Sequence, residues 1–296
     1  MSENQDFRDK IFTRLEAIED LPSLPTVIVK LTEKIQNVES SAADVSKIME
    51  EDPAIMARVL KLVNSSFYSG SLQDQKITNV KHAIVRLGYD AVKNIALTSS
   101  VFTIFKDDHE KVFNRTEFWR HCICTGITAN IIYEFSNLKK AQCPRESVAL
   151  AGLLHDMGKI VLEQYFYDVF TKILEFGKSY KKPTYEIEEA SVSVSHSEIG
   201  AWLAKKWSLS ADLVAAIEYH HNPFEAPEEY QPLVGLVHVA DYIVNTKGLG
   251  ESGNVVPPRL NQDVWDFLGM NINQIDEIME LVEEESKKSE ILLSLI

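Results

Sequence analysis

The sequence predicts an all-α protein made of two packed helical bundles, and three observations carry this prediction. Apolar residues recur at the three- and four-residue spacing of helices along most of the 296-residue chain. Alternating apolar and polar runs bounded by turn residues, which would indicate strands, are almost absent. The predicted helices are short and joined by tight connections, a pattern typical of a compact bundle.

The first bundle contains a predicted helix within residues 21–36, where two prolines precede an apolar run. Val27, Leu31 and Ile35 recur every four positions, so they share one face of a helix.

The helices that follow carry their own start and stop signals. After a serine cap, Asp44 lies in the first turn of the next helix. Asp52 caps a further helix and Pro53 takes its first position. Gly88 ends the helix after that, and Asp90 can cap the last helix of this bundle.

A polar stretch at residues 106–117 is the predicted boundary between the bundles. We expect an N-terminal bundle over residues 1–108 and a second bundle over residues 109–246. Over residues 247–296 we expect a Gly/Pro-rich loop, then C-terminal helices packed on the second bundle, with a partner-binding helix face as the alternative. The predicted helices of the second bundle lie within 117–135, 145–165, 191–207, 210–224 and 230–245.

Composition excludes several classes of partner. Asp and Glu outnumber Lys and Arg by 44 to 30, which gives a net charge of −14. Such a chain repels nucleic-acid backbones unless it has a local basic patch, and no basic run exceeds a pair of lysines. The N-terminus is polar, and no apolar run approaches the roughly 18 residues of a membrane span. We therefore expect a cytoplasmic protein with no nucleic-acid or membrane partner.

Cysteine usage supports the same compartment. The chain has three cysteines, an odd and sparse set that is typical of reducing conditions. Cys122 and Cys124 are two residues apart on a predicted helix and point in different directions. We interpret them as small buried apolar residues rather than as a metal-binding pair.

Imidazoles and carboxylates interrupt the apolar helices of the second bundle. Asp241, for example, lies in the apolar segment 230–245, where a bare carboxylate would be costly to bury. Taken singly, each such residue has an ordinary interpretation as a hydrogen-bonded core histidine, a helix cap or a surface pair. Together they come from five predicted helices and suit two or three first-row transition-metal ions. The candidate ligands are Glu117, His121, His155, Asp156, His196, His220, His221 and Asp241.

The spacing of these residues fits metal chemistry. Glu117 and His121 are four residues apart and project from one helix face. In the adjacent pair His155–Asp156, the imidazole can bind one ion while the carboxylate bridges to a second. Two ions that share a water supply hydroxide at neutral pH, and Lys159, one turn further on, can hold a phosphate oxygen. Asp156 and Lys159 are therefore the candidate catalytic residues.

The order His121, His155–Asp156, Asp241 resembles the H…HD…D signature of the HD phosphohydrolase superfamily. The remaining candidates are similar to the fuller ligand set of the HD-GYP branch, which hydrolyses cyclic di-GMP at di- or tri-iron, or manganese, centres. The residues carrying this second likeness are Glu117, Lys159, His196, His220 and His221.

The N-terminal half resembles the HDOD family, the HD-related output domain of bacterial signalling proteins. The stretches "LPSLPTVIVKL", "VSKIMEEDPAIMARVLKLVNSSFY" and "ITNVKHAIVRLGYDAVKNIAL" carry this likeness. It implies a cytoplasmic, all-α regulatory domain that commonly lacks HD ligands. Here every ligand position is filled, but "NPFEAPEEYQP" replaces the DGxGYP loop of HD-GYP enzymes after His221. A metal centre is therefore better supported than cyclic di-GMP as the substrate.

We thus expect a bacterial HDOD signalling protein whose second, HD-like bundle retains a di- or trinuclear His/carboxylate site. Iron is the first choice of metal ion, with manganese or zinc as alternatives. The alternative function is a metal-dependent phosphohydrolase that acts on a nucleotide or cyclic dinucleotide, so a phosphate-containing small molecule is the expected partner. A third interpretation is an interaction module with an empty pocket. His238 is interpreted as a core residue, or as support for a ligand.

Overall fold

The computed structural model describes residues 2–19, 21–36, 41–64, 76–105, 113–138, 143–287 and 293. These residues form helices and loops and include no strand, so the predicted all-α class is confirmed. The chain divides into two compact units. The larger contains Met1–Pro22 with Asp107–Val282, and the smaller contains Ser23–Lys106 with Glu283–Ile296.

These units differ from the predicted division in two respects. Glu283–Ile296 groups with the smaller unit, whereas the sequence analysis expected the C-terminal helices to pack on the second bundle. The first helix belongs to the larger unit, whereas the sequence analysis grouped it with residues 1–108. The expected boundary after residue 108 lies outside the described residues, and the three predicted ranges remain predictions.

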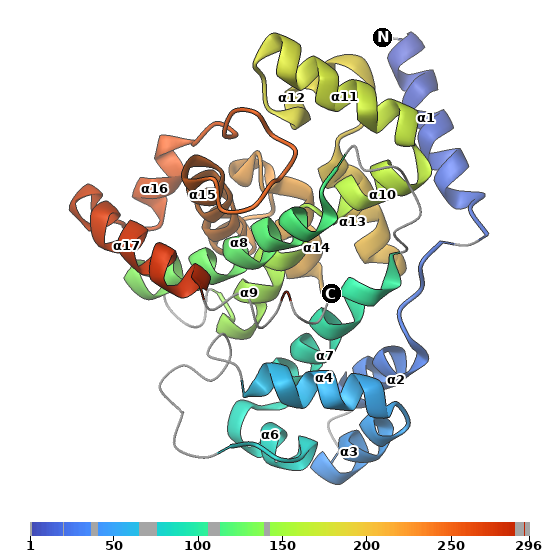
Figure 1. Ribbon diagram of the computed structural model, residues 1–296, viewed down its shortest axis with the longest axis vertical. Coiled ribbons are helices and arrows are strands. Elements are labelled where there is room, and N and C mark those ends of the chain that lie inside the picture. Colours follow the sequence, from blue (N-terminus) through green and yellow to red (C-terminus); the bar gives the residue numbers. More distant parts are fainter. Residues whose placement is uncertain are drawn as a thin grey trace. The chain divides into compact units, whose positions relative to one another are not determined.

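The smaller unit is built around the helices that the sequence predicts, labelled in Figure 1. They are α2 (Thr26–Gln36), α3 (Ala42–Glu50), α4 (Pro53–Val63), α6 (Val80–Leu87) and α7 (Tyr89–Ile104). The apolar side chains on one face of each helix pack between the helices, where Leu31, Val45 and Val59 are fully buried.

Most of the predicted signals of this unit are confirmed. Ser41 forms a capping box with Asp44, and Asp52 accepts hydrogen bonds from two main-chain N–H groups at the start of α4. Gly88 has φ +89° and ends α6. Asp90 does not cap α7, because this helix begins at Tyr89, directly after Gly88, and Asp90 lies in its first turn.

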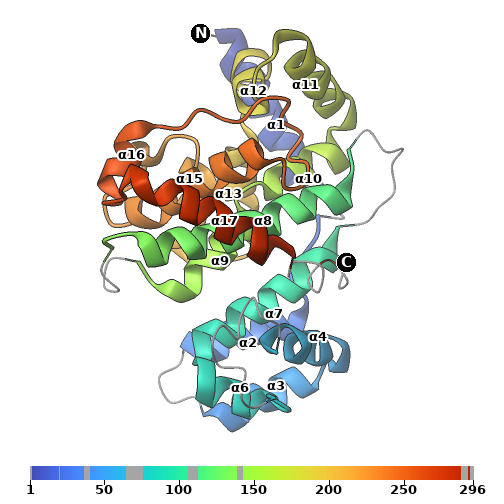
Figure 2. The ribbon, with the colours of Figure 1, turned by 60° about the vertical axis from the view of Figure 1, so that its left-hand side comes forward.

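The larger unit has α8 at its centre. α8, α9 and α15 pack against one another, while α10 packs on α13 and α13 on α14 (Figures 1 and 2). Its helices are α1 (Ser2–Glu16), α8 (Arg115–Phe135), α9 (Arg145–Leu154), α10 (Met157–Tyr165), α11 (Tyr167–Tyr180), α12 (Thr184–Ser191), α13 (His196–Lys206), α14 (Ala211–Tyr219), α15 (Gln231–Lys247), α16 (Gln262–Phe267) and α17 (Ile275–Ser286), with 3₁₀ turns η1 (Pro223–Glu225) and η2 (Ile272–Gln274). The unit boundary at Val282 falls within α17.

α8 and α9 approach each other very closely. A Cβ atom on Gly152 would lie 2.7 Å from the Cα atom of Gly126, so only glycine fits where these helices cross. This close contact places His121 of α8 beside His155, which directly follows α9; their ring centroids are 5.4 Å apart.

The apolar pattern of residues 151–162 predicted one continuous helix, but the structure has a break in this segment. α9 ends at Leu154, α10 begins at Met157, and His155–Asp156 form a turn between them. The Nδ1–H group of His155 donates to the main-chain oxygen of Gly152 at 2.7 Å, an oxygen that a continuous helix would use internally. The break thus places His155 and Asp156 in a turn between two helices.

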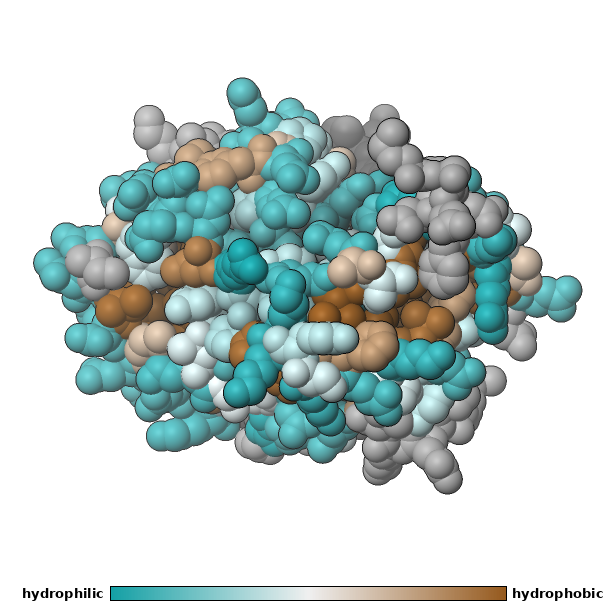
Figure 3. Space-filling model, turned by 90° about the horizontal axis from the view of Figure 1, so that it is seen from above, coloured by the Kyte–Doolittle hydropathy of each residue, from teal (hydrophilic) through white to brown (hydrophobic). Residues whose placement is uncertain are grey.

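The face of the larger unit shown in Figure 3 is largely hydrophilic. In this view, from the end at which α1, α11 and α12 lie in Figure 1, apolar side chains gather in a few patches, of which the one on the right is the most extensive. Within the described segments, no helix is both long enough and apolar enough to cross a bilayer. All three cysteines are buried and none of them forms a disulfide bond, and the predicted burial of Cys122 and Cys124 is confirmed.

Candidate metal centre

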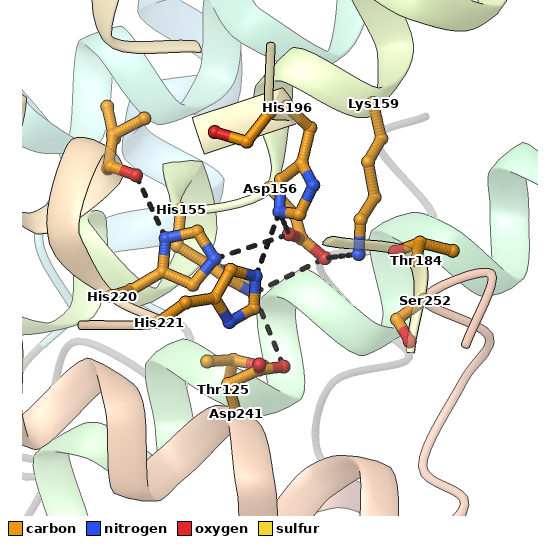
Figure 4. Close-up of polar contacts among 12 residues, drawn as sticks. Thr125, His155, Asp156, Lys159, Thr184, His196, His220, His221, Asp241 and Ser252 are labelled. Carbon is orange, nitrogen blue, oxygen red and sulfur yellow. Dashed lines mark hydrogen bonds and ion pairs between the residues drawn. The ribbon is translucent and has the colours of Figure 1, made fainter. Parts of the chain in front are cut away.

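Most of the predicted ligands meet in the larger unit, where the helices α8, α13 and α15 and two turns converge (Figure 4). Their ligating atoms form two groups, and within each group these atoms lie within 4.8 Å of one another. Subsite 1 contains His121, His155, Asp156 and Asp241, and subsite 2 contains His196, His220 and His221. All are buried except His221, which is partly exposed.

Asp156 joins the two subsites, because its two carboxylate oxygens face different groups of histidines. Oδ2 lies 3.4 Å from Nε2 of His155 and 3.7 Å from Nε2 of His121. Oδ1 lies 3.0 Å from Nε2 of His196 and 3.7 Å from Nε2 of His220. This is the arrangement of a carboxylate that can bridge two ions.

Asp241 completes subsite 1. Its Oδ1 atom lies 3.1 Å from Nε2 of His121 and 3.4 Å from Nε2 of His155. The side-chain amide of Asn245, one helical turn later on α15, donates to the same oxygen at 2.6 Å and fixes the carboxylate.

Hydrogen bonds orient the imidazole rings. His155 and His220 donate Nδ1–H to the main-chain oxygens of Gly152 and Ile217, at 2.7 and 2.9 Å. The Nε2 atoms of both rings then point into the centre and are the nitrogens that could bind a metal ion. Support of this kind for one ring nitrogen is the usual arrangement for histidines that bind metal through the other.

The site contains buried polar atoms without hydrogen-bond partners. Among the described residues these include both ring nitrogens of His121, Nε2 of His155 and His220, and Oδ1 of Asp156. Each buried unpaired polar atom costs about 1–3 kcal/mol, so a concentration of them at one place requires an explanation. Imidazole nitrogens and carboxylate oxygens that face one another without hydrogen bonds fit first-row transition-metal ions.

The charges also favour a cation. Burial opposes protonation of His155, but the Asp156 carboxylate beside it raises the pKa of His155 to about 10. Burial lowers the pKa of His220 well below its usual value, and the neighbouring His155 adds to this effect. Subsite 1 therefore attracts positive charge, while His220 in subsite 2 is a neutral nitrogen donor.

Two of the predicted site residues, Glu117 and Lys159, each form an ion pair with a residue three positions away. Glu117 is in neither subsite, and its carboxylate pairs with Nε of Arg120 at 3.2 Å on the partly exposed start of α8. Lys159 is 1% exposed and its Nζ atom lies 2.7 Å from Oδ2 of Asp156 (Figure 4). The ammonium group thus contacts a candidate ligand directly, and its role toward phosphate stays a prediction.

Two supporting residues complete the centre. His238 donates to the main-chain oxygen of His220 at 2.7 Å and accepts from the N–H group of Asn261 at 2.9 Å, so it stabilises the chain at His220. Glu188, which the sequence analysis did not single out, accepts from Nδ1 of His196 at 2.7 Å. Its position could have been noticed, because Glu188 lies on the same helix face as the buried Thr184 and Ile187.

Comparisons with known proteins agree with this fold. An uncharacterized protein of Treponema pallidum (strain Nichols) is 26% identical over 232 residues, which cover 77% of this chain and 43% of that protein. This chain therefore spans less than half the length of that relative.

Two solved structures share the fold. One is a candidate signal transduction protein from Marinobacter aquaeolei VT8, with 23% identity, a TM-score of 0.76, and coverage of 99% of this chain and 66% of that one. The other is a candidate phosphohydrolase from Shewanella amazonensis SB2B, with 22% identity, a TM-score of 0.71, and coverage of 95% and 97%. A family model described as the HDOD domain matches residues 21–223, and the chain belongs to the HDOD domain family.

Proposed function

We propose that this HDOD protein is a cytoplasmic signalling protein that holds two transition-metal ions, one at each subsite. The observation that carries the proposal is the group of buried, unpartnered Nε2 and carboxylate oxygen atoms around Asp156. Bound cations would give each of these atoms a partner. The family membership and the likeness to a candidate signal transduction protein support the signalling part of the proposal.

The donor set favours iron, with manganese or zinc as alternatives. The two subsites are built from histidines and aspartates, so they offer nitrogen and oxygen donors without a thiolate. Imidazole with carboxylate suits iron and manganese as well as zinc. Asp156 would hold both ions, Asp241 would add its charge at subsite 1, and the three histidines of subsite 2 would act as neutral ligands.

A second candidate function is phosphoester hydrolysis. When bound, a pair of such ions supplies a hydroxide at neutral pH. The observation favouring this function is Lys159, a buried cation beside Asp156, where it could neutralise a phosphate oxygen. The likeness to a candidate phosphohydrolase agrees with it. The substrate would be a nucleotide or a cyclic dinucleotide.

Metal analysis of protein purified without an affinity tag tests the main proposal. We expect wild-type protein to contain Fe, Mn or Zn, and Asp156→Ala to lose metal from both subsites because the bridge is removed. His82→Ala, on α6 and outside both subsites, is the control and should keep the full content. A wild-type content below about one equivalent, after incubation with each metal, would refute the proposal.

A panel of phosphoesters that includes cyclic di-GMP separates the two functions. Turnover by the metal-loaded wild type, lost in Lys159→Met without loss of metal, would support hydrolysis. Metal-loaded protein that hydrolyses none of the panel would leave a signalling role and refute hydrolysis of these substrates.

A further inference from the structure

Glu188 is a fully buried carboxylate on α12, the helix that precedes α13 and its candidate ligand His196. Its Oε2 atom accepts two hydrogen bonds of 2.7 Å, one from the main-chain N–H group of His196 and one from the Nδ1–H group of the same residue. Burial of an unpaired carboxylate costs several kcal/mol. These bonds, and the start of α13 at His196, where a helix favours negative charge, offset part of that cost, while Oε1 of Glu188 is buried without a hydrogen-bond partner.

His196 differs in this respect from the other oriented histidines of the centre. His155 and His220 donate Nδ1–H to neutral main-chain oxygens, whereas His196 donates to an ionisable side chain. A carboxylate behind an imidazole fixes the tautomer, holds the ring plane and makes the opposite nitrogen a stronger donor. That opposite nitrogen, Nε2, lies 3.0 Å from Oδ1 of Asp156 and 3.2 Å from Nε2 of His221.

Subsite 2 has fewer carboxylates than subsite 1, so a nearby negative charge would matter more there. Subsite 1 contains the carboxylates of Asp156 and Asp241, but subsite 2 consists of three histidines and shares only Oδ1 of Asp156. A divalent ion held there would keep an excess of positive charge in a buried place. Glu188, hydrogen-bonded to one of the three rings, supplies the missing negative charge without occupying a coordination position.

We infer that Glu188 is a positioning residue of subsite 2, which directs Nε2 of His196 toward the metal ion and raises the affinity of this subsite for divalent cations. The inference rests on the proposed function, because it presupposes that subsite 2 binds a metal ion.

The variant Glu188→Gln tests this role, because glutamine keeps the size of the side chain and removes its charge. The neighbouring Glu189 is exposed, so Glu189→Gln removes the same charge from the same helix without touching His196. Full-length wild type and both variants, freed of metal, are titrated with Co²⁺ against a competing chelator, and the visible absorption of Co²⁺ reports its ligands.

We expect Glu188→Gln to weaken one of the two Co²⁺ sites by about 10- to 100-fold and to change its absorption spectrum, while the other site is unaffected. Glu189→Gln should match the wild type. Equal affinity of Glu188→Gln and wild type at both sites would overturn the inference and leave the proposed function intact. If the wild type bound no Co²⁺, the proposed function itself would fail, and the inference with it.

A measurement on the wild type covers the case in which Glu188→Gln does not fold. In ¹⁵N-histidine-labelled, metal-free protein, His196 should carry a proton on Nδ1 that is strongly deshielded by the carboxylate and slow to exchange with solvent. Assignment comes from the signal that disappears in His196→Gln. A proton found only on Nε2 of His196 would overturn the inference.

Discussion

Replacement of Gly158 by alanine should disrupt the metal centre, although Gly158 is not a ligand. A Cβ atom at this position of α10 would lie 1.9 Å from the main-chain oxygen of His196 and 2.8 Å from the N atom of Gly200. Both atoms belong to the main chain of α13, so rotation of a side chain cannot relieve the clash. The oxygen would have to withdraw from 1.9 Å to beyond 3.0 Å, which means that the helices must separate by about 1.1 Å.

This shift can be compared with what a metal site tolerates. α10 follows Asp156 directly and α13 begins at His196, and the two side chains now approach to 3.0 Å. Metal–ligand distances vary by only about 0.2 Å, so a displacement of about 1.1 Å is several times the tolerance. We expect Gly158→Ala to lose metal from subsite 2, and overpacking of this kind to lower the free energy of unfolding by about 3 kcal/mol.

Urea unfolding and metal analysis measure the two effects separately. Gly177→Ala is the matched control, because a Cβ atom there meets only the main-chain oxygen of Lys182, at 3.3 Å. Alanine is the better helix former, so this control should lie within about 1 kcal/mol of the wild type. Wild-type stability and full metal content in Gly158→Ala would show that α10 and α13 do not pack at this short distance.

Three further predictions concern parts of the protein outside the centre. Glu163→Gln removes the charge that pairs with Nε and Nη2 of Arg115, and because both side chains are largely buried, unfolding measurements should show a loss of about 3 kcal/mol. Asp52→Ala removes the acceptor for two N–H groups of α4 and should cost about 1 kcal/mol in the same assay. Burial raises the pKa of the Cys143 thiol from 9.0 to about 12. The unfolded chain therefore loses this proton first, so stability should fall as the pH rises from about 9 toward 12, and Cys143→Ala should fall less steeply.

Local chemistry made much of the fold predictable. Ser41 and Asp52 cap the starts of helices, and Gly88 ends one, as the sequence predicts. Such caps are predictable because they depend only on neighbours within about four residues. The turn at His155–Asp156 was not predictable in this way. Its neighbours are apolar and helix-forming, and the turn forms where both side chains contact residues from helices distant in the sequence.

Glu117 and Glu188 show why spacing alone could not select the carboxylates of the centre. Glu117 has the favourable four-residue spacing to His121, but Arg120 is an equally close neighbour on the helix surface and pairs with it, and the side chain of Glu117 remains 31% exposed. Glu188 is one of three glutamates in "TYEIEEAS", and its partner His196 lies eight residues away, beyond any helical spacing. What distinguishes it is that α12 buries the face containing Thr184, Ile187 and Glu188. A charged residue on an apolar helix face must find a partner, so an acidic side chain on the buried stripe is better evidence for a role at this centre than one at regular spacing from a histidine.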